Sequence, residues 1–191
     1  MSKRVLVPIA DGAEEIEAVA IIDVLRRAGA EVTVASVMKD QLQVTASRGV
    51  KLVADQPINK CMDIPFDLIA LPGGIPGAQH LHDSKELTQL LERQNQGGKL
   101  YAAICAAPAV VLFPHGLLSH RRATCHPGRV KTFENTDTEA VNARVVVDGN
   151  CITSQGPGTA IEFSLKLVEL LFGPEKAKEV ADPMVVLSLA T

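Results

Sequence analysis

Short runs of apolar residues alternate with amphipathic segments along much of this 191-residue chain. A strand that is buried on both faces of a sheet reads as a continuous apolar run, and four such runs predict four core strands. They cover residues 4–10, 31–37, 67–71 and 100–104. Between the first two, apolar residues recur at helical spacing from Ala18 to Ala28, which predicts a helix that begins at Glu14. A strand, a helix and a second strand in so short a stretch form a βαβ unit, which implies a parallel sheet.

The segments between and after these strands carry weaker patterns. Residues 42–54 read as a small antiparallel excursion, residues 81–94 as a helix, and residues 57–66 and 114–142 as irregular. Residues 144–154 predict a hairpin with a two-residue turn.

The C-terminal part predicts two helices. The first starts at Thr159, where Glu162 three residues later completes a capping-box pattern, and it ends at Gly173. Its apolar stripe consists of Ile161, Leu165 and Val168. A short helix over 175–181 and an apolar tail over 184–187 follow. We expect the tail to pack onto the domain and to contribute to stability.

Strands that alternate with helices throughout indicate an α/β protein. We expect a three-layer sandwich with a mostly parallel sheet flanked by helices, of the flavodoxin-like or class I glutamine amidotransferase-like kind, in which residues 1–191 form a single domain.

Composition narrows the function classes. The apolar fraction is 47%, the charged fraction is 21% and the net charge is −3, so no basic surface favours nucleic acid or a membrane. No apolar run is long enough for a membrane span or a signal peptide, which predicts a cytoplasmic protein. The four cysteines at 61, 105, 125 and 151 are widely spaced, which favours free thiols over disulfides or a zinc site.

Cys105 is the candidate reactive atom. It follows the apolar run at 100–104, and the small residues Ala106 and Ala107 precede Pro108, which is tolerated in the first turn of a helix. A strand, a sharp turn and a helix form an elbow that holds a side chain clear of the sheet. From position alone, the thiol is either reactive or a small buried hydrophobe.

Other polar and small residues map to the same carboxyl-terminal edge of the sheet, where ligands of open α/β sheets bind. Gly73 and Gly74 follow the third core strand, and residues 155–158, with Pro157, follow the hairpin. Glycines there let backbone N–H groups approach a ligand or an oxyanion.

The first helix carries three glutamates. Helical phase directs Glu14 and Glu17 toward the core and turns Glu15 away, but it does not choose between the first two. A carboxyl group that is desolvated at this edge has a raised pKa, so it can stay protonated beside a thiolate.

Further polar residues have competing interpretations. His126 is a general base, a pocket wall or a structural histidine, and Cys125 beside it is a possible neighbour of Cys105. Arg27 and Arg48 are candidates for binding an anionic group, with solvated side chains as the alternative. The remaining histidines read as surface residues: His80, His82, His115 and His120. The pair at 80 and 82 is too isolated to claim a metal.

Seven motifs, which occur in order along nearly the whole chain, resemble those of the DJ-1 branch of the PfpI superfamily. Within that branch the sequence most resembles a bacterial member. The motifs are Gly12-Ala-Glu-Glu-Ile-Glu17, Asp23-Val-Leu-Arg-Arg-Ala-Gly29, Ser47-Arg48, Leu71-Pro-Gly-Gly74, Ala102-Ala-Ile-Cys-Ala106, His126-Pro127 and Thr153-Ser-Gln-Gly-Pro-Gly-Thr159.

The resemblance implies roles for individual residues. Cys105 matches the family's oxidisable elbow cysteine, and Glu17, rather than Glu14, matches the protonated glutamate that hydrogen-bonds it. Gly74 and Ala106 would supply the N–H groups that stabilise an oxyanion, and His126 would line the pocket. Arg48 would reach the site region across a homodimer interface to which the first helix contributes.

The resemblance also implies an activity. Family members are described as cysteine-dependent glyoxalases and deglycases that act on methylglyoxal, glyoxal or their early adducts with proteins and nucleotides, with lactate or glycolate as product. No cofactor or metal is expected. The alternatives are a redox-sensing stress chaperone that works through oxidation of Cys105 and an amidotransferase-like hydrolase. Ala106 stands where protease-like members carry a histidine, which argues against Cys-His hydrolysis.

Overall fold

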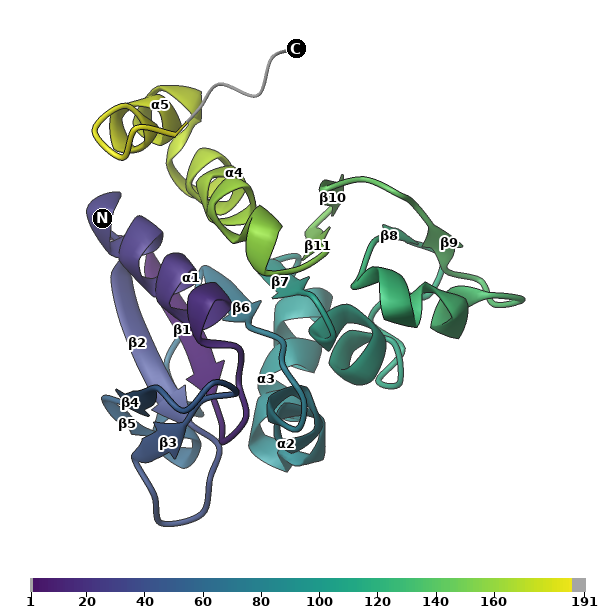
Figure 1. Ribbon diagram of the computed structural model, residues 1–191, viewed down its shortest axis with the longest axis horizontal. Helices are drawn as coiled ribbons and strands as arrows, with labels where there is room; N and C mark the ends of the chain where they lie inside the picture. Colours follow the sequence, from purple (N-terminus) through teal and green to yellow (C-terminus); the bar gives the residue numbers. More distant parts are fainter. Residues whose placement is uncertain (1, 187–191) are drawn as a thin grey trace.

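A seven-stranded sheet runs through the centre of the protein in our computed structural model, which describes residues 2–186 (Figure 1). The strand order is β10-β11-β7-β6-β1-β2-β5, and all neighbours are parallel except β10 and β11. The strands are β1 (Arg4–Ile9), β2 (Glu31–Ser36), β5 (Gln56–Pro57), β6 (Leu68–Leu71), β7 (Leu100–Ile104), β10 (Val145–Asp148) and β11 (Cys151–Ser154). The central strands β6 and β1 are almost wholly buried, as the continuous apolar runs predicted.

Helices cover both faces of this sheet. α1 (Glu15–Arg27) and α4 (Ala160–Phe172) lie side by side, while α2 (Gly77–Asp83) and α3 (Lys85–Gln96) pack on the central strands (Figure 1). α5 (Pro174–Ala181) packs on α4. The predicted α/β sandwich with a mainly parallel sheet is therefore confirmed. Within residues 2–186, no helix combines the length and apolarity that a membrane crossing requires.

The predicted helix over residues 81–94 is wrong in its extent, because two helices meet there. Ser84 has an extended backbone and its Oγ accepts a hydrogen bond from the Leu87 N–H at 3.2 Å, so it caps α3. α2 ends at Asp83 and begins earlier than the pattern indicated, at Gly77. Because a serine side chain can bond a backbone N–H group in place of a helical carbonyl, Ser84 ends one helix and caps the next.

The predicted helix after the Cys105 turn is present, as a single turn of π-helix over Pro108–Leu112. The Phe113 N–H donates to the Pro108 carbonyl at 2.9 Å, five residues back. Pro108 occupies the first turn, as expected.

Two smaller sheets complete the strands. β3 (Gln43–Thr45) and β4 (Lys51–Val53) form the predicted antiparallel excursion. In the segment that carried no readable pattern, β8 (Arg122–Ala123) pairs with β9 (Glu139–Ala140), and a 3₁₀ turn covers Pro127–Phe133.

At the C-terminal end the predicted capping box is wrong. The Thr159 hydroxyl bonds to Gly156, and the Glu162 carboxylate instead pairs with the Arg144 guanidinium at 2.6 Å. Ile161 is also exposed, at 36%, because α4 buries a face that includes Phe163 and Leu167.

The helix ends at Gly173 as expected, and the predicted hairpin has its two-residue turn between Asp148 and Cys151. In the predicted apolar tail, Met184 packs against the core, while residues 187–191 lie outside the described residues.

Candidate active site

Cys105 stands on a sharp elbow at the carboxyl end of β7, between β6 and β11 in the sheet (Figure 1). Its φ of +63° is the left-handed conformation, which a residue with a Cβ adopts only where its surroundings enforce it. Two backbone hydrogen bonds do so here. The Cys105 N–H donates to the Ser154 carbonyl at 3.0 Å, and its carbonyl accepts from the His126 N–H at 2.7 Å. The thiol is thereby directed off the end of the strand.

The carboxyl group of Glu17 meets this thiol from the first turn of α1. Glu17 is fully buried, and its Oε2 accepts a hydrogen bond from the Gly73 N–H at 2.8 Å. Its Oε1 has no hydrogen-bond partner within residues 2–186, and the carboxyl group lies close enough to the Cys105 thiol for each group to change the pKa of the other. Glu14 has a different task, since its Oε2 caps the helix by accepting the Glu17 N–H at 2.8 Å. Of the two inward-directed glutamates, the structure therefore brings Glu17 to the cysteine.

Burial raises the pKa of Glu17 to about 7, because the carboxylate is desolvated in the core. The hydrogen bond from the Gly73 N–H and the neighbouring Cys105 thiol oppose this rise, and the charge of Glu14 adds to it. The raised pKa that the sequence suggested for an inward carboxyl group thus has burial as its main cause.

Burial also raises the pKa of the Cys105 thiol, to about 12, and a charged Glu17 carboxylate raises it further. The N–H groups of Gly74 and Ala106 donate to the sulfur and oppose the rise. A resting thiolate, as expected from the sequence, does not fit these values. Near neutral pH the sulfur therefore keeps its proton while Glu17 titrates, and a thiolate forms only when the thiol proton passes to an ionised Glu17.

The loop after β6 approaches Cys105 closely because it begins with two glycines. A Cβ on Gly73 would lie 2.7 Å from the Cys105 Cβ, and a Cβ on Gly74, at φ +87°, would lie 2.5 Å from the Glu14 N and the Gly12 O. Since Glu17 already occupies the Gly73 N–H, Gly73 does not serve as an oxyanion donor. The N–H groups of Gly74 and Ala106 remain the candidate oxyanion donors.

His126 borders the site with an exposed side chain whose Nδ1 accepts a hydrogen bond from the Gly128 N–H at 3.1 Å. In the neutral ring this arrangement puts the hydrogen on Nε2, which makes the exposed nitrogen a donor. The general-base interpretation of His126 does not fit this tautomer. Pro157, also exposed, opens a 3₁₀ turn after β11 at the same edge of the sheet.

Glu15 is the residue whose orientation the helical phase missed. It is buried, and its carboxylate accepts hydrogen bonds from the Ser47 hydroxyl and the Arg48 N–H, both at 2.7 Å. These bonds lower the pKa of Glu15 against the effect of burial. Glu15 therefore fixes the 47–48 loop to the helix that carries Glu17. The periodicity of apolar residues in one helix cannot predict a hydrogen-bond partner that comes from another segment.

The two arginines are placed differently. Arg48 is exposed, and its guanidinium donates to the Ser47 carbonyl at 3.2 Å. Arg27 pairs with Asp23 at 2.6 Å at the other end of α1, about 15 Å along the helix from Glu17. The structure does not bring Arg27 to the cysteine. The guanidinium of Arg27 is instead paired with the Asp23 carboxylate.

The remaining histidines and cysteines lie away from this chemistry or at its margin. His82 and His115 are half-buried and stacked, with ring centroids 4.6 Å apart, so they are not the surface residues that the sequence predicted. His80 is half-buried and His120 is exposed. All four cysteines are free thiols. Cys61, Cys125 and Cys151 are 0–2% exposed, whereas Cys105 is 8% exposed.

Comparison with known proteins places this geometry among relatives. The model of the DJ-1/PfpI family matches residues 3–170. Over 185 residues the chain is 49% identical to "Protein DJ-1 homolog B" of Arabidopsis thaliana, an alignment that covers 97% of this chain and 42% of that protein. The chain thus spans less than half the length of this plant relative.

Two other matches cover nearly the whole of both chains. "Glutathione-independent glyoxalase DJR-1.2" of Caenorhabditis elegans is 38% identical, over 96% of this chain and 95% of the relative. The solved structure "Toxoplasma gondii DJ-1, oxidized" superposes with a TM-score of 0.94 at 48% identity, over 97% of this chain and 100% of that one. The closeness to a bacterial member stays a prediction.

Proposed function

Because the chain belongs to the DJ-1/PfpI family, we propose that it is a cysteine-dependent glyoxalase that converts methylglyoxal or glyoxal into lactate or glycolate without a cofactor. The observation that carries this proposal is the proximity of the buried Glu17 carboxyl group, whose Oε1 has no hydrogen-bond partner within residues 2–186, to the Cys105 thiol on its strained elbow. The similar worm protein is named as a glutathione-independent glyoxalase, and a thiol supplied by the protein itself would replace glutathione in such chemistry.

In the first step, the Cys105 sulfur attacks the aldehyde carbon of methylglyoxal and a carbon–sulfur bond forms. The thiol proton passes to Glu17, because a carboxyl group with a pKa of about 7 accepts and returns protons near neutral pH. The carbonyl oxygen becomes an oxyanion beside the N–H groups of Gly74 and Ala106, which already donate toward the sulfur. Protonation of this oxygen gives a hemithioacetal.

In the second step, a base removes the hydrogen from the carbon that is bonded to sulfur, and the hemithioacetal hydroxyl proton moves to the neighbouring carbonyl oxygen, which gives an enediol intermediate. A proton is then added to the neighbouring carbon as the carbonyl group re-forms on the carbon bonded to sulfur. The product is a thioester of lactate. Water then cleaves the carbon–sulfur bond, lactate leaves, and Cys105 recovers its proton. Glu17 carries the protons in this scheme. The overall reaction adds one water to methylglyoxal and consumes no oxidant or reductant.

Deglycation uses the same thiol. In an early adduct, the aldehyde carbon carries a hydroxyl group and the nitrogen of a protein or nucleotide amine. Attack by Cys105 breaks the carbon–nitrogen bond, releases the free amine and leaves the same hemithioacetal on the enzyme. The exposed ring of His126, with a donor at Nε2, is positioned at the mouth of the site to hydrogen-bond such a substrate.

A redox-sensing stress chaperone is the second candidate, in which peroxide oxidises Cys105 to a sulfinate. Its support is that Cys105 is the most exposed of the four cysteines and that the Gly74 and Ala106 N–H groups point at its sulfur. An amidotransferase-like hydrolase has less support, because it needs a histidine base and the Nδ1 of His126 accepts from Gly128.

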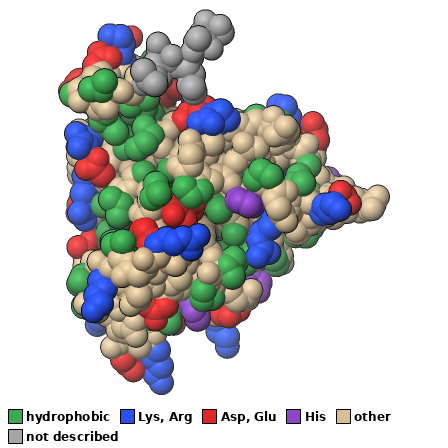
Figure 2. Space-filling view, in the orientation of Figure 1, with side chains coloured by type: hydrophobic (Ala, Val, Ile, Leu, Met, Phe, Trp, Pro, Cys, Tyr) green, Lys and Arg blue, Asp and Glu red, His purple; other side chains and the backbone are tan. Residues whose placement is uncertain are grey.

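We further propose a homodimer formed through α1 and α4. Hydrophobic side chains gather over these two helices on the face shown in Figure 2. Among them, Ile16 is 58% exposed and Val19 is 46% exposed. Since Glu15 fixes the Arg48 loop to α1, such a dimer would hold Arg48 at the interface and direct it toward the site region.

A cytoplasmic location and a single domain over residues 1–191 complete the proposal. Four free cysteines suit a reducing compartment. One continuous hydrophobic core joins residues from Val5 to Val180, which supports the single domain.

The test is a methylglyoxal turnover assay that measures lactate, with wild type, Cys105→Ser and the control Cys61→Ser. Cys61 is a buried thiol outside the site, whose Sγ accepts a hydrogen bond from Gln56. We expect lactate formation to fall to background in Cys105→Ser and to persist in the control. Lactate formation that survives Cys105→Ser, with contaminating glyoxalase excluded by an enzyme-free blank and a mock purification, overturns the proposal.

A further inference from the structure

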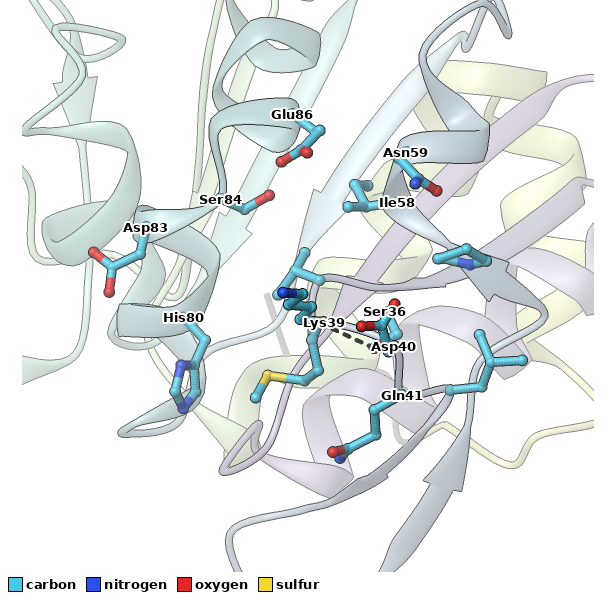
Figure 3. A pocket seen from close by; sticks show the side chains of 14 residues that line it. Ser36, Lys39, Asp40, Gln41, Ile58, Asn59, His80, Asp83, Ser84 and Glu86 are labelled. Atoms are coloured by element: carbon cyan, nitrogen blue, oxygen red, sulfur yellow. Dashed lines mark hydrogen bonds between the residues drawn. The ribbon is translucent and has the colours of Figure 1, made fainter.

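A cavity of about 670 Å³, separate from the Cys105 site, opens at the carboxyl ends of β2 and β5, where α2 meets α3 (Figure 3). Its walls come from residues 36–42, 57–59 and 80–86. In the sheet, β6 and β1 separate β7 from β2, which puts the cavity about 14 Å from the Cys105 elbow. Its volume lies within the range of sites that bind small molecules.

The floor of the cavity has two buried hydroxyl groups. Ser36 Oγ accepts the Met38 N–H at 3.1 Å and Ser84 Oγ accepts the Leu87 N–H at 3.2 Å, so each hydroxyl hydrogen is free to donate. Neither hydroxyl donates to an acceptor within residues 2–186. The buried side chain of Ile58 adds an apolar part to the lining. The floor therefore offers hydrogen-bond donors beside an aliphatic surface.

Charged side chains of both signs line this cavity: Lys39 and the exposed Asp40 on the loop after β2, and Asp83 and Glu86 on the side of α2 and α3. The Glu86 carboxylate, half-buried in the first turn of α3, points into the gap, while Lys39 extends from the loop after β2 (Figure 3). Within the described part of the chain, neither side chain forms an ion pair or a hydrogen bond, with each other or with a third residue. Asp83 lies at the rim and its carboxylate points away from Lys39 (Figure 3).

The N-terminal end of a helix favours an acidic residue, which explains a glutamate at position 86. It does not explain a lysine on the opposite wall that remains apart from that carboxylate. A ligand with one charge would satisfy one of the two side chains and be repelled by the other. A zwitterion satisfies both.

We propose that this cavity binds a small aliphatic zwitterion, either a free α-amino acid or a dipeptide. The ammonium group of the ligand binds the Glu86 carboxylate, and the ligand carboxylate binds Lys39 and the Ser36 hydroxyl. The aliphatic side chain packs on Ile58. Binding is non-covalent and independent of Cys105, so the inference does not rest on the proposed glyoxalase activity.

The experiment is an NMR titration of ¹⁵N-labelled protein with leucine and leucylleucine, which separate the two ligand sources. Leucinamide and N-acetylleucine are the matched probes, since each lacks one of the two charges. We expect shifts in the amides of residues 36–42, 58–59 and 80–86, and binding of the better zwitterion roughly tenfold tighter than that of either analogue. Equal binding of an analogue, or no response in these amides, overturns the proposal.

Variants assign the two charges. Lys39→Gln and Glu86→Gln should each weaken zwitterion binding roughly tenfold. The matched controls are Lys51→Gln and Glu92→Gln, which exchange exposed side chains outside the cavity. Equal losses in the controls, or unchanged binding in the two test variants at an unchanged melting temperature, contradict the assignment. Cys105→Ser should bind as wild type does, and a loss there would place the ligand at the cysteine instead.

Discussion

The carboxyl group of Glu17 and the thiol of Cys105 form a buried, electrostatically coupled pair between the first turn of α1 and the elbow after β7. Both pKa values are raised because each group is desolvated, and a charged Glu17 carboxylate raises the pKa of Cys105 further. The pair is therefore uncharged below about pH 7, and above this pH it carries a single negative charge and can exchange its remaining proton between sulfur and carboxylate. This relationship determines the predictions for activity and for stability.

Replacement of Glu17 by Gln should reduce kcat for methylglyoxal roughly 10²–10⁴-fold, because the amide no longer accepts the thiol proton. The amide oxygen can still accept the Gly73 N–H that now binds Oε2 at 2.8 Å, so the loop should keep its position. Steady-state kinetics measure the effect, with Glu92→Gln on α3 as the surface control. A Glu17→Gln enzyme with wild-type kcat would remove Glu17 from the proton-transfer role.

The stability of the protein should depend on pH through Glu17. Its pKa rises from 4.5 to about 7 on folding, so between these values the folded protein holds a proton that the unfolded chain has released. The contribution of the protonated group is fully present below pH 4.5 and is lost as the pH rises through 7. Relative to Glu17→Gln, wild type should lose about 3 kcal/mol of unfolding free energy across this window.

Urea unfolding of both proteins at about pH 5 and about pH 8 measures this difference. The Gln variant carries no titratable group at the site, so it corrects for every other group in the chain. A free-energy difference between the two proteins that is constant over this range would show that Glu17 is ionised in the folded state at both pH values.

Gly73→Ala should disturb both loops of the site. The new methyl group would lie 2.7 Å from the Cys105 Cβ and 2.9 Å from the Ala106 N and the Ile104 O, and backbone atoms cannot yield without a shift of the strand end. We expect a loss of about 1–3 kcal/mol in stability together with lower turnover. Gly158→Ala is the control, since nothing lies within 4 Å of its Cβ position. Equal melting temperatures for the two variants would contradict the close approach.

Mild peroxide should oxidise Cys105 before the other three cysteines, because its sulfur is the most accessible and is surrounded by N–H donors that stabilise an anionic product. Peptide mass spectrometry would detect the sulfinate as a gain of about 32 Da on the peptide that contains Cys105. Cys125, beside His126 at the margin of the site, is the internal comparison. Its oxidation at equal or lower peroxide would argue against a sensor based on Cys105.

Ile16→Asp should convert a homodimer into monomers, because it puts a charge on the exposed apolar face of α1. Sedimentation velocity measures the mass in solution. Val130→Asp is the matched control, since Val130 is 39% exposed in the 3₁₀ turn over Pro127–Phe133, away from α1 and α4. A wild-type protein that sediments as a monomer would refute the dimer directly.

The sequence by itself determined the main elements of the fold and the position of the thiol. Burial on both faces forces a parallel core strand to be apolar throughout, so β1, β2, β6 and β7 are visible as runs of apolar residues. The elbow at Cys105 is visible because a strand ends there and small residues precede Pro108. Helical phase reduced the choice of carboxyl group to Glu14 or Glu17, and the resemblance to a family selected Glu17.

Only the tertiary structure decided which polar groups meet. Glu15 faces Ser47, Ser84 interrupts a helix, the Nδ1 of His126 accepts from Gly128, and Lys39 shares a cavity with Glu86. The physical reason is that the periodicity of apolar residues shows only which face of a helix or strand is buried. A hydrogen-bond partner comes from another part of the chain, and its identity depends on how the loops at the sheet edge are packed together.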